Sequence, residues 1–269
     1  MKAVLLARGL GSRMKAEGDA TLTAAQAAAA AAGAKGMMPV GGQARPFLDF
    51  VLSALADAGC RDVCFVVAPD YAGIRQYYDG PGRPSRVRIA YAVQPAADGT
   101  ARAVLAAQPF AGRDPFLALN SDNLYPPPVL RALVALDGPG LAGYRRQSLV
   151  QESGFPPERV AAFAAIDVDG QGYLTRIVEK PGQAYYDAAG PDALISMNAW
   201  RFDERIFDAC RDVPQSIRGE FELPEAVGLA VSRGVRFKVV PAAGAVLDLS
   251  RRSDVALVTA RLAGESARP

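Results

Sequence analysis

The first half of the chain alternates short apolar runs with stretches of helical periodicity. Residues 2–7 and 62–69 are largely apolar runs of strand length, and between them, over 45–60, apolar residues recur at helical spacing. The alternation continues along the chain, with strands predicted at residues 87–94 and 114–123 and helices at 100–110 and 127–136. Strands that alternate with helices form βαβ units, whose right-handed crossovers give a parallel sheet. The pattern therefore predicts an α/β fold.

The second half of the chain has a less regular pattern. Residues 160–181 predict two strands joined by a turn at Asp169–Gly172. The remaining predictions are strands at residues 192–202 and 235–242 and helices at 222–234 and 253–264, the last with Ser253 near its cap. Neither a Pro/Ser-rich linker nor an internal repeat divides the sequence. We therefore expect a single domain over residues 1–269.

Composition excludes several classes of protein. The formal net charge of +2 gives no bulk electrostatic case for binding nucleic acid or a membrane surface. The sequence has no histidine, which excludes Ser-His-Asp, Cys-His and histidine–metal chemistry. Its three cysteines, Cys60, Cys64 and Cys210, lack zinc-site spacing, and Cys64 lies in an apolar run that favours a buried thiol. No stretch has signal-peptide or membrane-spanning length, so we expect a cytoplasmic protein.

The segment Gly9-Leu10-Gly11-Ser12-Arg13 directly follows the first predicted strand. Glycines let the backbone approach an anion closely, and the Arg13 guanidinium offers a fork of donors for phosphate oxygens. The segment matches neither the Walker P-loop nor the dinucleotide-binding pattern. By itself it predicts either a phosphate-binding loop or a plain strand-to-helix turn.

Polar residues end two further strands. Asp122 closes a predicted strand, at the sheet edge where ligands bind in open α/β sheets. A carboxylate there is a candidate Mg²⁺ ligand, with an Asx turn as the alternative. Glu179 and Lys180 end another strand, where a solvated lysine is the simpler interpretation. Lys35 and Gln94 carry little meaning singly.

Taken together and in order, these segments resemble the sugar-1-phosphate nucleotidyltransferases, also called nucleotide-sugar pyrophosphorylases. LARGLGSRM resembles the family's Leu-Ala-Gly-Gly-x-Gly-Thr-Arg-Leu signature, and KGMMPVGG resembles its Pro-Lys-x-x-x-Pro-Val segment. VQPAADGTARAV is similar to the segment that reads the base. LNSDN and VEKP are similar to the metal-binding and sugar-phosphate-binding segments, and VLDLSRRSDV is a weaker match to the end segment.

The resemblance implies a Rossmann-like three-layer αβα sandwich with a mixed, mainly parallel sheet, similar to the GT-A fold. It implies transfer of a nucleoside monophosphate from a nucleoside triphosphate (NTP) to a sugar 1-phosphate, which gives a nucleoside diphosphate sugar and pyrophosphate. It also implies a nucleotide-binding part at about residues 1–125, a sugar-binding part at about 126–250 and a C-terminal helix at about 251–264.

The family's site residues carry over to this chain motif by motif. The resemblance assigns catalysis to Arg13, Lys35, Asp122 and Lys180, and Mg²⁺ binding to Asp122 and Asp248. It assigns nucleotide binding to Leu6, Ala7, Gly9, Gly11, Ser12, Arg13, Gln94, Gly99, Thr100 and Asp122. It assigns sugar phosphate binding to Gly143, Glu179, Lys180 and Asn198. The implied partners are an NTP and a sugar 1-phosphate, and the oligomeric state stays open.

The chain departs from the family pattern at several places. Arg8 stands where the family has Gly or Ala, Ser12 replaces Thr, Ala34 replaces the proline before Lys35, and Leu249-Ser250-Arg251 replace a Gly-Thr turn. An alanine-rich insertion within residues 16–34 is expected to form a short exposed helix. It is either a neutral surface addition or a lid over the nucleotide site. Arg8 either reaches the phosphates or packs against this insertion.

These departures keep alternatives open. One is a catalytically impaired homologue with a regulatory or binding role, and another is nucleotidyl transfer to a non-sugar phosphate such as a cyclitol phosphate. A third is a GT-A-type glycosyltransferase, which would favour an Asp-x-Asp metal motif, whereas NSDN has a single acidic residue. The nucleobase and the sugar stay open, because the Gln94 amide can hydrogen-bond any base.

Overall fold

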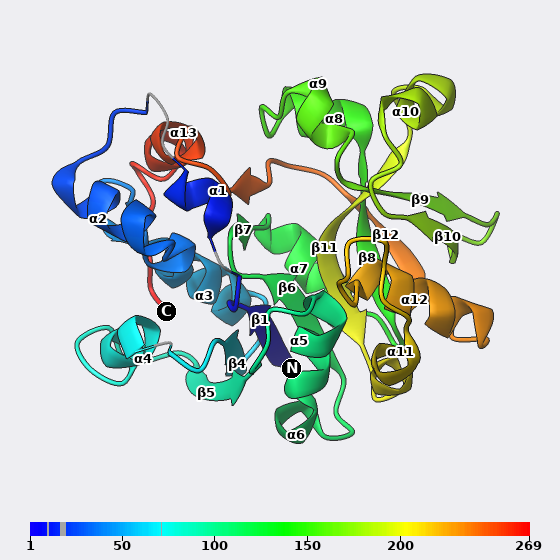
Figure 1. The fold of residues 1–269 in the computed structure, drawn as a ribbon, viewed down its shortest axis with the longest axis horizontal. Coiled ribbons are helices and arrows are strands. Elements are labelled where there is room, and N and C mark those ends of the chain that lie inside the picture. The colour runs from blue at the N-terminus through cyan, green and yellow to red at the C-terminus, as the bar shows by residue number, and fades with distance from the viewer. Residues whose placement is uncertain (10, 17–19, 71) are drawn as a thin grey trace.

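A central β-sheet runs through the whole molecule (Figure 1). The computed structural model describes residues 1–9, 11–16, 20–70 and 72–269. Among these residues the sheet has nine strands, in the order β10-β9-β11-β6-β1-β4-β5, with β8 pairing with β11 and β12. The strands are β1 (Lys2–Leu6), β4 (Asp62–Val67), β5 (Arg88–Val93), β6 (Phe116–Asn120), β8 (Gly140–Arg145), β9 (Ala164–Val168), β10 (Leu174–Val178), β11 (Leu194–Phe202) and β12 (Lys238–Ala242).

Strand direction changes between the two halves of the sheet. Strands β6, β1, β4 and β5 are parallel, as the βαβ pattern predicts. Strand β11 pairs antiparallel with β6, β8 and β9, so the sheet is mixed, as the resemblance implies. Leu6 at the end of β1 is in register with Asn120 at the end of β6. Ser121 N also donates to Leu6 O at 3.3 Å, so the ends of β1 and β6 lie side by side.

Helices cover both faces of the sheet. Ala3 and Leu5 of β1 belong to one buried cluster and Val4 to the other, because successive side chains of a strand point to opposite faces. The first cluster contains α3 (Phe47–Asp57), α7 (Pro127–Val134) and α13 (Asp254–Arg261), and the second contains α5 (Thr100–Ala106), α11 (Ile206–Asp212) and α12 (Leu223–Ser232). The expected three-layer sandwich is confirmed.

Shorter elements surround this framework. They are α1 (Ser12–Lys15), α2 (Ala24–Ala32), the 3₁₀ helix η1 (Lys35–Met37), α4 (Ala72–Tyr78), α6 (Gln108–Ala111), α8 (Arg146–Gln151), α9 (Pro157–Val160), α10 (Gln183–Ala189), β2 (Pro39–Val40), β3 (Arg45–Pro46), β7 (Asn123–Leu124) and β13 (Leu247–Asp248). Of these, the sequence predicts α2 and includes most of α6 in the helix expected at 100–110, while α4 and α8 to α10 carry no clear pattern. Among the described helices, none combines the length and apolar character needed to cross a membrane.

The helix predicted at residues 100–110 is two helices. It breaks at Ala107, because Pro109 stands in the first turn of α6 and has no amide hydrogen to continue the α5 ladder. Thr100, which is the first residue of the predicted helix and could cap it, does not do so, because Gly99 with φ +119° precedes the first turn. The Thr100 hydroxyl instead accepts a hydrogen bond from Leu223 N, at 2.9 Å, and so ties α5 to α12.

The alanine-rich insertion forms a helix that packs on the protein. Thr23 and Gln26 make a capping box at the start of α2, and Gly33 with φ +68° ends it. Most of α2 is exposed, but Ala30 is fully buried, and the Gln26 amide donates to Pro39 O at 3.0 Å. Gln26 also reaches Thr259 of α13, and Figure 1 shows α1, α2 and α13 gathered on one side of the molecule. Part of the insertion, residues 17–19, lies outside the described residues.

Candidate active site

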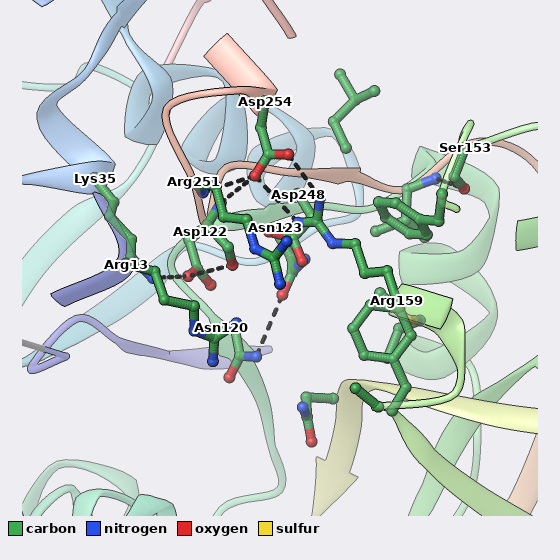
Figure 2. Close-up of a pocket in the computed structure, with 18 of the residues that line it drawn as sticks. Arg13, Lys35, Asn120, Asp122, Asn123, Ser153, Arg159, Asp248, Arg251 and Asp254 are labelled. Carbon is green, nitrogen blue, oxygen red and sulfur yellow. Dashed lines mark hydrogen bonds and ion pairs between the residues drawn. The ribbon is translucent and has the colours of Figure 1, made fainter. Parts of the chain in front are cut away.

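A cleft of about 760 Å³ opens at the carboxyl end of β6 (Figure 2). Its walls come from α1, from β7 and β13, from the segment between α8 and β9, from the residues that follow β10 and from the middle of β11. Eight of the predicted site residues line it: Arg13, Lys35, Thr100, Asp122, Glu179, Lys180, Asn198 and Asp248. Residues far apart in the sequence therefore meet in one place.

Gly11 directly precedes α1, the helix whose Arg13 lines this cleft. Gly11 has φ +64°, a left-handed conformation that favours glycine, and its carbonyl accepts hydrogen bonds from Met14 and Lys15 of α1. A Cβ at Gly11 would lie 2.4 Å from the carbonyl oxygen of Gly33, so the end of α2 closes directly onto the glycine segment. Arg13, in the first turn of α1, points into the cleft.

Asp122 and Asp248 come together through a two-stranded ribbon. Strand β13 pairs antiparallel with β7, which sets Asp248 opposite Asn123, and Leu249 N donates to Asp122 O at 2.8 Å. The ammonium of Lys35 lies 2.8 Å from Asp122 Oδ2. Burial, followed by the neighbouring Asp122 charge, raises the pKa of Asp248 to about 6, while Arg159 opposes the shift.

The carboxylate pair fits a divalent cation. Asp248 Oδ1 is buried and lies 3.0 Å from Arg159 Nη2, but it makes no hydrogen bond within the described residues. No group of three or more His, Cys, Asp or Glu side chains suited to a metal ion occurs in the part of the chain that the structure describes. Two carboxylates together with substrate phosphates are nevertheless the way in which Mg²⁺ is commonly held in proteins. Asp122 and Asp248 therefore suit Mg²⁺ in the presence of a nucleotide.

The opposite end of the cleft carries the residues expected to bind the sugar. A register shift between Ser196 and Trp200 lets Asn198 adopt φ +58° and line the cleft, and Lys180 after β10 has φ +47°. Burial raises the pKa of Glu179 to about 7, with nearby Glu222 adding to the shift.

Several predicted residues lie outside the cleft lining. They are Leu6, Ala7, Gly9, Gly11, Ser12, Gln94, Gly99 and Gly143. The buried Gln94 amide donates to Asp98 Oδ1 at 2.8 Å and to Gly99 O at 3.0 Å, so it shapes the loop before α5. A Cβ at Gly143 would lie 2.6 Å from Val239 Cγ1, which gives this glycine a packing role in the sheet.

Arg8 bonds to the segment that follows β5. Its guanidinium donates to Gln94 O and Pro95 O, both at 3.4 Å. These long hydrogen bonds join the end of β1 to the loop that carries Gln94. Arg8 is absent from the described cleft lining, and both of these hydrogen bonds go to the segment after β5 and not to the alanine-rich insertion, so neither of its two expected roles receives direct support.

Sequence reasoning missed seven charged residues of the described cleft lining: Glu158, Arg159, Arg218, Glu220, Glu222, Arg251 and Asp254. Arg159 of α9 holds both carboxylate oxygens of Asp254, at 2.6 and 3.1 Å. Arg218 contacts Glu222 and lies 3.6 Å from Glu179. The available signal for Arg218 and Glu222 is the charged stretch RGEFE at residues 218–222, which leads into the helix predicted at 222–234.

Comparison with known proteins gives this site a context. The family described as nucleotidyl transferase matches residues 2–245. The chain belongs to this family. It is 29% identical over 84% of its length to a low-salt glycan biosynthesis nucleotidyltransferase of Haloferax volcanii, and it spans 56% of that relative. It is 27% identical over 94% of its length to a UTP–glucose-1-phosphate uridylyltransferase of the same organism, spanning 93% of it.

Further relatives agree with this placement. A glucose-1-phosphate thymidylyltransferase of Neisseria gonorrhoeae is 27% identical over 84% of the chain, which spans 69% of that relative. Among solved structures, a UDP-glucose pyrophosphorylase complexed with UDP-glucose superposes with a TM-score of 0.74 at 16% identity, covering 97% of each chain. The family and the fold implied by the sequence motifs are therefore confirmed, and the protein is a nucleotidyltransferase.

Proposed function

We propose that this nucleotidyltransferase joins a nucleoside monophosphate from an NTP to a sugar 1-phosphate and releases pyrophosphate. The observation that carries the proposal is that Arg13 beside the glycine segment and Lys180 after β10 line the same cleft as Asp122. The named relatives that act on glucose 1-phosphate support this substrate class. The glycine segment and the loop carrying Gln94 are proposed to hold the nucleotide.

The chemistry needs charge and alignment more than proton transfer. The phosphate of a sugar 1-phosphate is already an anionic nucleophile, so the reaction needs no general base, and the absence of histidine from the sequence is no obstacle. The barrier is repulsion between two anions together with charge that develops on the leaving pyrophosphate. We assign Arg13 to the β- and γ-phosphates, Lys35 to the transferring phosphoryl group and Lys180 to the sugar phosphate, in line for attack.

Asp122 and Asp248 are the residues that would hold Mg²⁺. The ion would supply Lewis-acid neutralisation of the α-phosphate charge. Lys35, at 2.8 Å from Asp122, holds that carboxylate in place. On the sugar side, Glu179 and Asn198 offer hydrogen-bonding groups for hydroxyls. Gly143 contributes through the packing of β8.

An activity panel tests this proposal. The purified protein is assayed for pyrophosphate release with each common NTP, each of several sugar 1-phosphates and a cyclitol phosphate, in the presence of Mg²⁺. We expect release with one or a few pairs. A protein that binds an NTP but releases no pyrophosphate with any acceptor would instead be the regulatory or binding homologue.

The metal assignment is tested separately by Asp122→Asn. We expect turnover to fall on the order of 100-fold or more, with an unchanged circular dichroism spectrum. Asp114→Asn is the matched control, because Asp114 precedes the opposite end of β6 and is exposed. Near-normal turnover in the Asp122 variant would overturn the metal assignment.

A further inference from the structure

Most cations of the cleft are already neutralised by carboxylates of the protein. Lys35 pairs with Asp122, Arg159 pairs with Asp248 and Asp254, and Arg218 pairs with Glu179 and Glu222. Lys180 lies 4.0 Å from Glu179. Six cationic and seven acidic side chains are found among the described lining residues, so the cleft as a whole has no excess of positive charge.

Two guanidinium groups stand apart from these pairs. Within the described chain, the side chains of Arg13 and Arg251 line the cleft without a hydrogen bond or an ion pair to the protein, and Figure 2 shows both pointing into it. An NTP and a sugar 1-phosphate together bring several negative charges into this space. Unlike Lys35 and Lys180, which would meet substrate phosphates from an ion pair with the protein, Arg13 and Arg251 have no carboxylate partner to leave among the described residues. The family signature accounts for Arg13 but not for Arg251.

The backbone of Arg251 is fixed in place. Asp254 Oδ2 accepts the N–H groups of Ser250 and Arg251, at 2.9 and 2.7 Å, and Arg159 holds Asp254 in turn. The next residue, Arg252, donates to Met14 O at 3.0 Å. The turn that carries Arg251 is thus anchored on both sides, and its long side chain is directed at the cleft.

These hydrogen bonds place Arg251 at the Arg13 end of the cleft, where the proposed function puts the triphosphate. Leu249 N donates to Asp122 O, and Arg252 donates to the carbonyls of Met14 and Lys15 in α1, the helix that follows the glycine segment. The Glu179–Lys180 end of the cleft makes none of these contacts in the described structure.

We propose that Arg251 is a second phosphate-binding arginine, which with Arg13 grips the β- and γ-phosphates of the NTP and the pyrophosphate that leaves. This inference rests on the proposed function. A guanidinium forms paired, charge-assisted hydrogen bonds with phosphate oxygens. Because Arg251 occupies the place of a Gly-Thr turn, this chain provides a cation that can bind the leaving pyrophosphate, and the family motif has none at this position.

Calorimetric titration with inorganic pyrophosphate and with the preferred NTP tests the proposal on the intact protein. We expect Arg251→Gln to weaken binding of both ligands by about 10- to 100-fold, and Arg251→Lys to weaken it less. In the reverse reaction the KM for pyrophosphate should rise, while the KM for the sugar 1-phosphate in the forward reaction stays unchanged. Arg83→Gln removes the same charge from an exposed position outside the described cleft lining and should leave every constant unchanged.

Two results would overturn the inference. One is an affinity for pyrophosphate and NTP within twofold of wild type in Arg251→Gln. The other is a rise confined to the KM for the sugar 1-phosphate, which would move Arg251 to the acceptor. The titration with pyrophosphate does not depend on turnover. It therefore measures the contribution of Arg251 to pyrophosphate binding even if the activity panel finds no acceptor and the proposed function fails.

Discussion

At the scale of single residues, Gly11 carries the tightest constraint of the site. Its φ is +64°, and a Cβ there would lie 2.4 Å from Gly33 O, a backbone atom that cannot swing aside. We predict that Gly11→Ala lowers the free energy of unfolding by about 2–4 kcal/mol, because strain and a clash add. The variant should also weaken NTP binding, since α1 and α2 must separate. Urea denaturation and calorimetric titration measure the two effects.

Gly59→Ala is the matched control for this prediction. Gly59 also has a positive φ, +90°, but a Cβ there meets nothing within 4 Å. In Gly59→Ala only backbone strain acts, so we expect the free energy of unfolding to fall by about 1–2 kcal/mol. Equal losses of stability in the two variants would show that the contact between Gly11 and Gly33 carries no weight.

Glu179 makes stability depend on pH. Burial, reinforced by Glu222, raises the pKa of Glu179 from 4.5 to about 7, so between these values the folded chain binds a proton that the unfolded chain has lost. The stability that this proton contributes is complete below about pH 4.5 and is lost as the pH rises through about 7. Raising the pH across this window therefore destabilises the fold.

We predict that Glu179→Gln removes this loss. Relative to the variant, the free energy of unfolding of the wild type should fall by as much as about 3 kcal/mol between about pH 5 and pH 8. Urea denaturation at a series of pH values measures the difference. Glu265→Gln, at an exposed carboxylate, should follow the wild type. Parallel curves for wild type and Glu179→Gln would contradict the assignment.

At the scale of elements, the turn after β13 depends on α9. Arg159 is 13% exposed and holds Asp254, whose carboxylate accepts the N–H groups of Ser250 and Arg251. We predict that Arg159→Gln lowers the free energy of unfolding by about 3–5 kcal/mol, because Asp248 and Asp254 are then buried without a counter-ion. Arg159→Lys keeps the charge but not the two-pronged contact, so its loss should be intermediate.

An exposed ion pair provides the comparison for Arg159. Arg233 lies 2.8 Å from Asp212 at the surface, and Arg233→Gln should cost less than about 1 kcal/mol. Chemical denaturation of the three variants ranks them directly. If Arg159→Gln lost no more stability than Arg233→Gln, the turn after β13 would not rely on α9.

Elements with strong local patterns are those that the sequence predicts. The apolar run of β4 and the periodic helix α3 are examples, and both form close to their expected bounds. Strand β8, with the sequence GLAGYR, has no such pattern, because its extended form depends on pairing with β11 and β12. Arg159 escaped prediction for a related reason: its role arises from a contact with a distant segment.

At the scale of the whole molecule, strand polarity explains which parts of the site were predictable. The carboxyl ends of parallel strands share one edge of the sheet, so the sequence could place Asp122 at the ligand-binding edge, and the pairing of β1 with β6 then makes the two strand ends neighbours. Asp248 and Asn198 arrive on antiparallel elements, where register and a local shift decide their position. Family resemblance assigned those two residues, and periodicity alone could not.

The same sheet makes a prediction about unfolding. The proposed nucleotide-binding and sugar-binding parts share it, because β6 of the first pairs with β11 of the second, Ala118 facing Trp200. We predict one cooperative transition for the whole chain, with calorimetric and van't Hoff enthalpies in a ratio of about one.

Two probes follow the two parts separately. Trp200, the single tryptophan, reports on the second part by fluorescence, and labelling of the buried Cys64 thiol on β4 reports on the first. Their midpoints in urea should coincide, since neither part can unfold without exposing an edge of the other's strands. Labelling of Cys64 well before the loss of Trp200 fluorescence would instead mean that the two parts unfold separately.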